Sequence, residues 1–173
     1  MLSVPESTNF KWRLSVKTAP ENPRFIIVGF QAYKDGDQTK NQSTFDHVNL
    51  KNAYVMLNSD RHPAVDYNLS FSDQKFSRVN GHEALFAVKF FGMDELITQT
   101  NITPSDYKTL YSLFTFDVSK PKEKLKSSVV DIQIKANFTE NVPTNTRAFA
   151  LVISDKMSFH QTVTQCLYFI KKS

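Results

Sequence analysis

Residues 130–138 read VDIQIKANF and carry the most regular pattern in the chain. Apolar and polar side chains alternate there with a period of two, and a β-strand points alternate side chains to opposite faces. The pattern therefore predicts a strand with one face in the core and one face in water. The side chains predicted to share the core face are Val130, Ile132, Ile134, Ala136 and Phe138.

Three other stretches extend this pattern along the chain. Residues 10–17 alternate in the same way, beginning with Phe10 and Trp12. Residues 24–31 (RFIIVGFQ) and 147–155 (RAFALVISD) are apolar on both faces, as in strands that are covered on both sides. Four side chains from residues 130–138 and 147–155 are expected in the core: Ile132, Ile134, Phe149 and Leu151.

Shorter segments complete the predicted strands. They are residues 49–57, 67–71, 113–118 and part of 159–170, whereas the polar residues 34–44 predict a long loop. About eight short antiparallel strands with long connections are typical of a sandwich. The sequence therefore predicts an all-β fold, a single jelly-roll sandwich.

A change of period predicts a short two-helix insertion at about residues 79–111. The first helix is expected over residues 80–92, where a capping box precedes apolar residues at i, i+3 and i+4 spacing. The second helix is predicted from an N-cap, a proline at the first helical position and an acidic first turn. These three positions are Thr103, Pro104 and Asp106, and the expected inward face is Tyr107, Leu110 and Tyr111.

Length and composition bound the protein class. The chain has 173 residues and 19.8 kDa, which fits one domain at residues 1–173. Its fifteen Phe, six Tyr and one Trp favour β-structure, and its one cysteine cannot form an internal disulfide. No apolar stretch approaches the ~20 residues of a membrane helix, and the first residues do not read as a secretory signal. We therefore expect no membrane contact and no secretion through a signal peptide.

The net charge of +4 raises the question of nucleic-acid binding. Of the 21 basic residues only five are Arg, the side chain that forks onto phosphates and base edges. The densest basic cluster, residues 120–126 (KPKEKLK), contains no aromatic side chain for base stacking. We favour a solvated loop over a polyanion site there, and predict no specific nucleic-acid site.

The four histidines lack the spacing of a metal or catalytic site. An iron-oxygenase or cupin site needs His-x-His or His-x-Asp, which none of the four provides. Asp46 and His47 could form half of a catalytic pair, but neighbours on a loop usually point apart. Four glycines leave no phosphate loop and no nucleophile elbow. We predict that the chain is not an enzyme and has no catalytic, cofactor-binding or metal-binding residue; the histidines are His47, His62, His82 and His160.

Two further features have simple structural interpretations. Cys166 stands among Leu167, Tyr168 and Phe169 and is interpreted as a small buried hydrophobe. Four Asn-x-Ser/Thr sequons are interpreted as chance occurrences in a chain with twelve Asn. They lie at Asn41, Asn68, Asn101 and Asn137, the last of these within a predicted strand.

Three blocks of sequence, taken in order, resemble a known family. They are residues 22–31 (NPRFIIVGFQ), residues 45–59 (FDHVNLKNAYVMLNS) and residues 125–149, which run from LKSSVVDI to VPTNTRAF. The set resembles the second jelly roll of the double-jelly-roll major capsid proteins of Polinton-like elements, adintoviruses and virophages. Copies of these proteins also lie in animal genomes.

The resemblance implies a structural role in a shell around DNA, without catalysis or cofactor. The family carries two jelly rolls per chain and this chain is long enough for one. The implied partners are therefore other capsid subunits or a first jelly-roll domain. We expect the isolated chain to be monomeric or weakly associating, and a homo-oligomer within an assembled shell also fits. The implied location is the virion, or the cell interior for a host-retained copy.

A second function stays open at this point. Jelly rolls also serve as binding modules, lectin-like or receptor-binding, with no role in assembly. An exposed cluster of Trp and Tyr would favour sugar binding, whereas edge-to-edge assembly would favour the capsid role.

Overall fold

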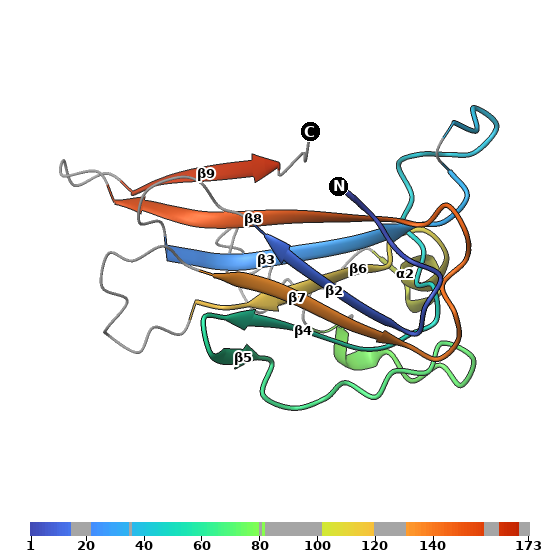
Figure 1. Ribbon diagram of the computed structural model, residues 1–173, viewed down its shortest axis with the longest axis horizontal. Helices are drawn as coiled ribbons and strands as arrows, with labels where there is room; N and C mark the ends of the chain where they lie inside the picture. Colours follow the sequence, from blue (N-terminus) through green and yellow to red (C-terminus); the bar gives the residue numbers. More distant parts are fainter. Residues whose placement is uncertain are drawn as a thin grey trace.

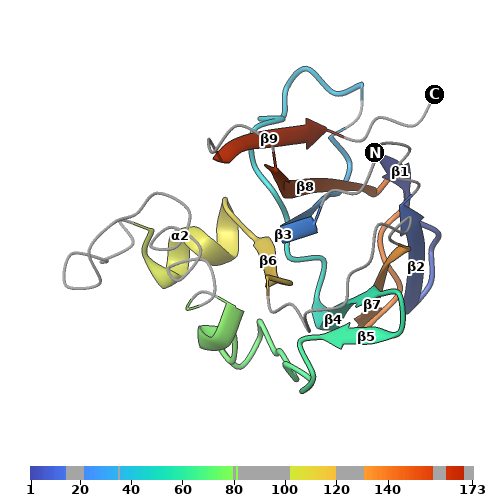
Figure 2. The same cartoon turned by 90° about the vertical axis from the view of Figure 1, so that its left-hand side faces the viewer.

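Two antiparallel sheets pack face to face in the computed structural model of the protein (Figure 1). The structure describes residues 1–14, 22–34, 36–79, 81, 102–119, 131–157 and 163–169. Figure 2 looks along the strands and shows the two sheets as separate layers, with helix α2 (Pro104–Thr109) outside them. This arrangement is a β-sandwich.

The first sheet has five strands. Its order is β1, β8, β3 and β6, and β9 also pairs with β8. β1 and β9 share one edge of β8, because β1 pairs with residues 147–148 and β9 with residues 151–157. The bounds are β1 (Leu2–Ser3), β3 (Asn22–Gln31), β6 (Leu113–Asp117), β8 (Arg147–Met157) and β9 (Val163–Phe169).

The second sheet has four strands in the order β2, β7, β4 and β5. β4 and β5 form a hairpin in which Leu57 pairs with Asp60 across a two-residue turn. Asn58 in that turn has a φ of 55°, a left-handed conformation that asparagine tolerates well. The bounds are β2 (Asn9–Leu14), β4 (Leu50–Leu57), β5 (Asp60–His62) and β7 (Ile132–Phe138).

The strands pair in a nested order. β4 pairs with β5, β3 with β6, β2 with β7 and β1 with β8. The chain therefore folds back on itself at the β4–β5 turn, and each early strand lies beside its late counterpart. Pairing of β3 with β8 and of β4 with β7 joins these pairs into two sheets. This nesting is the jelly-roll topology, so the predicted all-β jelly-roll sandwich is confirmed.

The core lies between the sheets and follows the strand alternation. In β7 the apolar side chains are buried and the polar ones face outward, as the opening sequence pattern predicts. Phe30 of β3 stands among aromatic rings of both sheets, with ring centroids 6.2 Å from Phe10 and 5.4 Å from Phe138. Trp12 is 5% exposed and belongs to the same cluster.

Most predicted strands are confirmed. Residues 10–17, 24–31, 49–57, 113–118 and 147–155 correspond to β2, β3, β4, β6 and β8, and β9 lies within residues 159–170. The polar loop after β3 extends beyond the end of the sandwich, at the upper right of Figure 1.

The strand predicted at residues 67–71 is wrong. Tyr67, Leu69 and Phe71 are buried, as their alternation indicates, but they form no strand of either sheet. Asn68 between them has a φ of 49°, which interrupts an extended backbone. The place beside β4 belongs instead to the short polar strand β5, Asp60–His62.

The second predicted helix is confirmed as α2, but its inward face is only partly right. Thr103 caps the helix, since its side-chain oxygen accepts a hydrogen bond of 3.1 Å from the backbone N–H of Asp106. Tyr107 is fully buried, whereas Leu110 and Tyr111 are 38% and 42% exposed. The helix ends at Thr109, so helical spacing no longer places these two beside Tyr107. Of the helix predicted over residues 80–92 only residue 81 is described, and it is helical; the rest lies outside the described residues.

The core prediction for β8 is wrong at two positions. The buried side chains that β8 contributes to the space between the sheets are Ala148, Ala150 and Val152. Phe149 and Leu151 alternate with them and lie half-buried on the opposite, outer face of the sheet. An apolar run does not show which face meets the second sheet, so the sequence alone could not separate the inner from the outer residues of β8.

Candidate functional site

The outer face of the five-stranded sheet is apolar in its middle. The register places Leu113 of β6, Gly29 of β3 and Phe149 of β8 side by side across three strands. Residues directly opposite in neighbouring strands share a face, so all three point away from the sandwich core. The next row on the same face consists of Thr115, Ile27 and Leu151.

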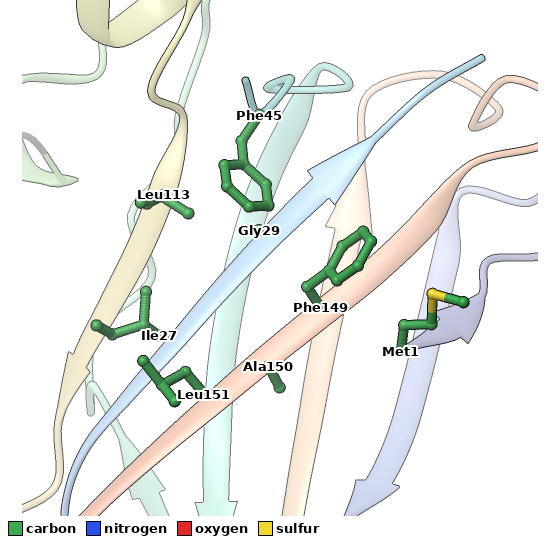
Figure 3. Close-up of a pocket in the computed structure, with 8 residues that line it drawn as sticks. All are labelled: Met1, Ile27, Gly29, Phe45, Leu113, Phe149, Ala150 and Leu151. Carbon is green, nitrogen blue, oxygen red and sulfur yellow. The ribbon is translucent and has the colours of Figure 1, made fainter. Parts of the chain in front are cut away.

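A groove of about 270 Å³ opens on this face (Figure 3). Its floor is Gly29, where a Cβ would lie 2.5 Å from Cδ1 of Phe45 and 2.9 Å from Cδ2 of Leu113. Only glycine therefore lets the Phe45 ring pack against the strand backbone. The rings of Phe45 and Phe149 stand edge to face, with centroids 6.0 Å apart. The remaining apolar walls include Ile27, Leu113 and Leu151.

The chemistry of this groove is limited to apolar contact. Among the described residues, the side chains that line it carry no ionisable group, so these side chains offer no acid, base or charged ligand. At one end it adjoins a more polar hollow of about 350 Å³, lined in part by Gln31, Gln42 and Arg147. Gln31 closes that end by donating a 2.6 Å hydrogen bond from Nε2 to the carbonyl oxygen of Gln42.

A buried ion pair holds the segment that carries Phe45. Lys34 is 8% exposed, and its Nζ lies 2.9 Å from Oδ2 of Asp46. The same ammonium donates to the carbonyl oxygen of Thr44 at 2.8 Å and to its Oγ1 at 2.7 Å. Asp46 also accepts a 2.9 Å hydrogen bond from the backbone N–H of Ala32. These bonds fix residues 44–46 beside the end of β3 and so position the Phe45 ring over the groove.

The comparisons with known proteins now decide the family. The family model described as "Double jelly roll-like domain" matches residues 2–158, a span that includes β1 to β8. The chain belongs to the double jelly roll-like domain family. Comparison with curated proteins and with solved structures gave no match. Domains of the double jelly roll-like family are typically structural rather than catalytic.

Sequence reasoning missed the groove of this double jelly roll-like domain, although it recognised two of its strands. The signal was available, because β3 and β8 are apolar on both faces. We assigned Phe149 and Leu151 to the core because a strand buried on both sides reads the same way. Gly29 and Phe45 carry no signal of their own, since their contact requires the folded loop.

The candidate pair Asp46 and His47 does not act as a pair. Asp46 is engaged with Lys34, whereas the ring of His47 stacks on Phe71 with centroids 4.3 Å apart and an interplanar angle of 8°. Nδ1 of His47 accepts a 3.0 Å hydrogen bond from the backbone N–H of Asn49. The two side chains point to different partners, as expected for neighbours on a loop.

The His47 turn should make the domain sensitive to acid. Burial and, second, the positive charge of Lys108 lower the pKa of His47 from its ordinary value of 6.5, against the smaller opposite effect of Asp46. The unfolded chain therefore takes up this proton at a higher pH than the folded domain. The contribution of neutral His47 is complete above about pH 6.5 and is lost as pH falls through the lower folded-state pKa.

Urea unfolding at about pH 7.5 and about pH 5 checks this expectation. His47→Asn keeps an acceptor for the N–H of Asn49 but does not titrate. We expect its midpoint to fall less than that of the native chain between the two pH values. Equal falls in both proteins would contradict a role for His47.

The other predicted absences stay predictions. In the part of the chain that the structure describes, no three His, Cys, Asp or Glu side chains gather as metal ligands would. Among these same residues no helix has the length and apolar character needed to cross a membrane. The side chains of His82, His160 and Cys166 and the basic cluster at residues 120–126 lie outside the description. Of the sequons, Asn41 and Asn68 are exposed, Asn137 lies in β7, and Asn101 is outside the described residues.

Proposed function

We propose that the chain is a capsid shell subunit, or a host-retained relative of one, that packs laterally on another jelly roll. The observation that supports this most is the apolar outer face of the five-stranded sheet, with its groove at Gly29. The family supports a structural role, and this face supplies a surface through which such a role could operate.

The two sides of the five-stranded sheet differ in what covers them. Its inner side is covered by the second sheet, so the fold itself needs apolar residues there. The outer side carries Ile27, Leu113, Phe149 and Leu151 without that need, and each is half-buried rather than covered. Contiguous apolar surface on a folded domain marks an interaction site more often than chance. A neighbouring sheet face with complementary side chains would remove this surface from water.

The neighbour in this proposal is another jelly roll. It would be a further capsid subunit or a first jelly-roll domain, as the resemblance implies, and the assembled location would be the virion, or the cell interior for a host-retained copy. One roll would bury only part of the contacts of a closed capsomer. We therefore expect the purified chain to associate weakly with itself.

The lectin-like alternative has less support. Sugar sites commonly use exposed aromatic rings, and the chain has one Trp. That residue, Trp12, lies in the core and cannot contribute to a surface site. The exposed rings of Tyr33 and Tyr111 are accompanied by no exposed Trp, so the described residues do not form the exposed Trp and Tyr cluster that would favour sugar binding.

Sedimentation velocity on the purified chain tests the proposed contact, with the chain itself as the probe. Interfaces below about 1,200 Å² are typical of weak encounters, so we expect monomer near ~10 µM and reversible association near ~1 mM. The double variant Phe149→Ser/Leu151→Ser should stay monomeric at both concentrations. Val65→Ser, which alters a 66% exposed apolar residue elsewhere, should associate like the native chain.

Two results would reject the lateral contact through this face. One is association that persists unchanged in the Phe149→Ser/Leu151→Ser variant. The other is association that the Val65→Ser control loses to the same extent. A native chain that stays monomeric at the highest concentration would instead exclude a second copy as the partner and leave a first jelly-roll domain. Circular dichroism of each variant verifies that the sandwich is folded in every comparison.

A further inference from the structure

The outer face of the four-stranded sheet is polar and basic, unlike that of the five-stranded sheet. The register across β2, β7 and β4 places Lys11 beside Lys135, and Lys135 beside Tyr54. Trp12, Ile134 and Val55, which alternate with these residues, are buried, so this row points to solvent. The next row consists of Arg13, Gln133, Met56 and Arg61.

Lys11 and Lys135 are directly opposite each other on neighbouring strands. Like charges in that position destabilise a sheet, so the fold itself gains nothing from the pair. Among the described residues, two carboxylates near this face are paired with its arginines. Asp131 accepts a 2.7 Å hydrogen bond from Nε of Arg13, and Asp66 forms an ion pair with Arg61. In the described residues no carboxylate lies within ion-pair distance of either lysine.

The ring of Tyr54 gathers two of the cations. The guanidinium carbon of Arg61 lies 4.1 Å from the ring centroid, and Nζ of Lys135 lies 5.6 Å from it. Cations are attracted to the face of an aromatic ring, so Tyr54 holds both, and Lys135 in turn stands opposite Lys11. Three cations thus lie across this face, of which Arg61 is paired with Asp66, and we call this group the Lys11–Lys135–Arg61 patch.

The composition of this patch favours one kind of partner. Protein–protein interfaces are depleted of lysine and have an apolar centre, whereas this face carries Lys11 on its edge strand β2 and Lys135 on the inner strand β7. Protein–nucleic acid interfaces are polar and positively charged, and most of their hydrogen bonds go to phosphate and sugar. The Tyr54 ring already holds cations against it, so base stacking is not its function. A phosphate backbone supplies negative charges that could be shared between the two opposed lysines.

We propose that the Lys11–Lys135–Arg61 patch binds the phosphate backbone of nucleic acid without sequence preference. This goes beyond lateral packing, because it assigns a different partner to a different face of the sandwich. It is also compatible with the sequence-based expectation of no specific nucleic-acid site, since phosphate contacts carry no base information. Phosphate binding would then explain why two lysines stand opposite each other, which the stability of the sheet does not explain.

Fluorescence anisotropy with a labelled 20-base-pair DNA duplex tests the proposal over a range of salt concentrations. Neutralising two phosphate contacts contributes about 1.8 to the slope of log affinity against log salt. Lys11→Gln/Lys135→Gln should therefore lose about that much slope and bind the duplex at least ~10-fold more weakly at ~50 mM salt. Lys40→Gln/Lys75→Gln removes two exposed lysines elsewhere and gives the same net charge.

The control separates the patch from the overall charge. We expect Lys40→Gln/Lys75→Gln to bind within about 2-fold of the native chain, because phosphate contacts act locally. An equal loss in both variants would attribute binding to net charge and overturn the proposal. No measurable binding of the native chain at ~50 mM salt would overturn it as well.

Two additional measurements test two alternatives. The first alternative is that the lysines stabilise the fold, and the second is that they bind an acidic protein. The urea midpoint of Lys11→Gln/Lys135→Gln should equal or exceed that of the native chain, since a like-charge pair is removed. A clear fall would mean that the lysines serve stability. Poly-glutamate should compete with the duplex less effectively than unlabelled DNA does at equal charge. If it competes better, the partner is an acidic protein surface and the nucleic-acid assignment is wrong.

Discussion

Ile134→Asp should lower the free energy of unfolding by about 4 kcal/mol, enough to unfold a large part of the protein at ambient temperature. Ile134 is fully buried and lies between Trp12 of β2 and Val55 of β4 in the register. The substitution removes its packing and places a carboxylate where no cation can reach it. Urea unfolding followed by tryptophan fluorescence measures the loss, because Trp12 lies beside the site.

Lys135→Asp is the matched control, one residue further along the same strand. Its side chain is on the outer face, where aspartate would stand opposite Lys11. An attractive pair then replaces a repulsive one, at the loss of the contact with Tyr54, so the change should stay within about 1 kcal/mol. Equal urea midpoints for the two variants would show that the register of β7 is wrong.

The second large effect is expected at the ion pair beneath the loop. Asp46→Ala should cost about 2 kcal/mol, because it leaves the ammonium of Lys34 buried without its carboxylate. The value is below that of a fully buried pair because the Asp46 side chain is 33% exposed. The backbone N–H of Ala32 also loses its acceptor.

A double-mutant cycle separates the stranded charge from the lost hydrogen bonds. Lys34→Met in the Asp46→Ala background removes the unpaired ammonium while it keeps most of the side-chain volume. We expect the double variant to be more stable than Asp46→Ala alone. If it is less stable, Lys34 contributes mainly through Thr44, and the ion pair is not what holds the loop.

Much of the sandwich could be predicted from the sequence because one face of several strands is plainly polar. Ile134 and Lys135 show the principle, since their alternation assigns each side chain to a face before any partner strand is known. β5 shows its limit. Asp60, Arg61 and His62 have no apolar alternation, and only the tight turn after Leu57 brings them beside β4.

The candidate surfaces could not be predicted because they depend on register and on a loop. Phe149 and Leu151 look like core residues until the pairing shows that Ala148 and Ala150 occupy the inner face. Lys11 and Lys135 are far apart in sequence, and only the pairing of β2 with β7 places them side by side. Local patterns carry no information about such long-range pairs.

The nested pairing of the strands has a consequence for how the chain reaches this fold. Leu57 meets Asp60 across a short turn, whereas Leu2 must meet Ala148 from almost the opposite end of the polypeptide. Closing a long loop in one step is entropically costly, but each inner pair that forms shortens the loop left for the next one. Assembly from the β4–β5 hairpin outward therefore spreads this cost over successive steps. Most contacts still join residues far apart in the sequence, which is typical of slowly folding domains. We therefore expect the strands of this domain to pair more slowly than the helices of a bundle of equal size form and pack.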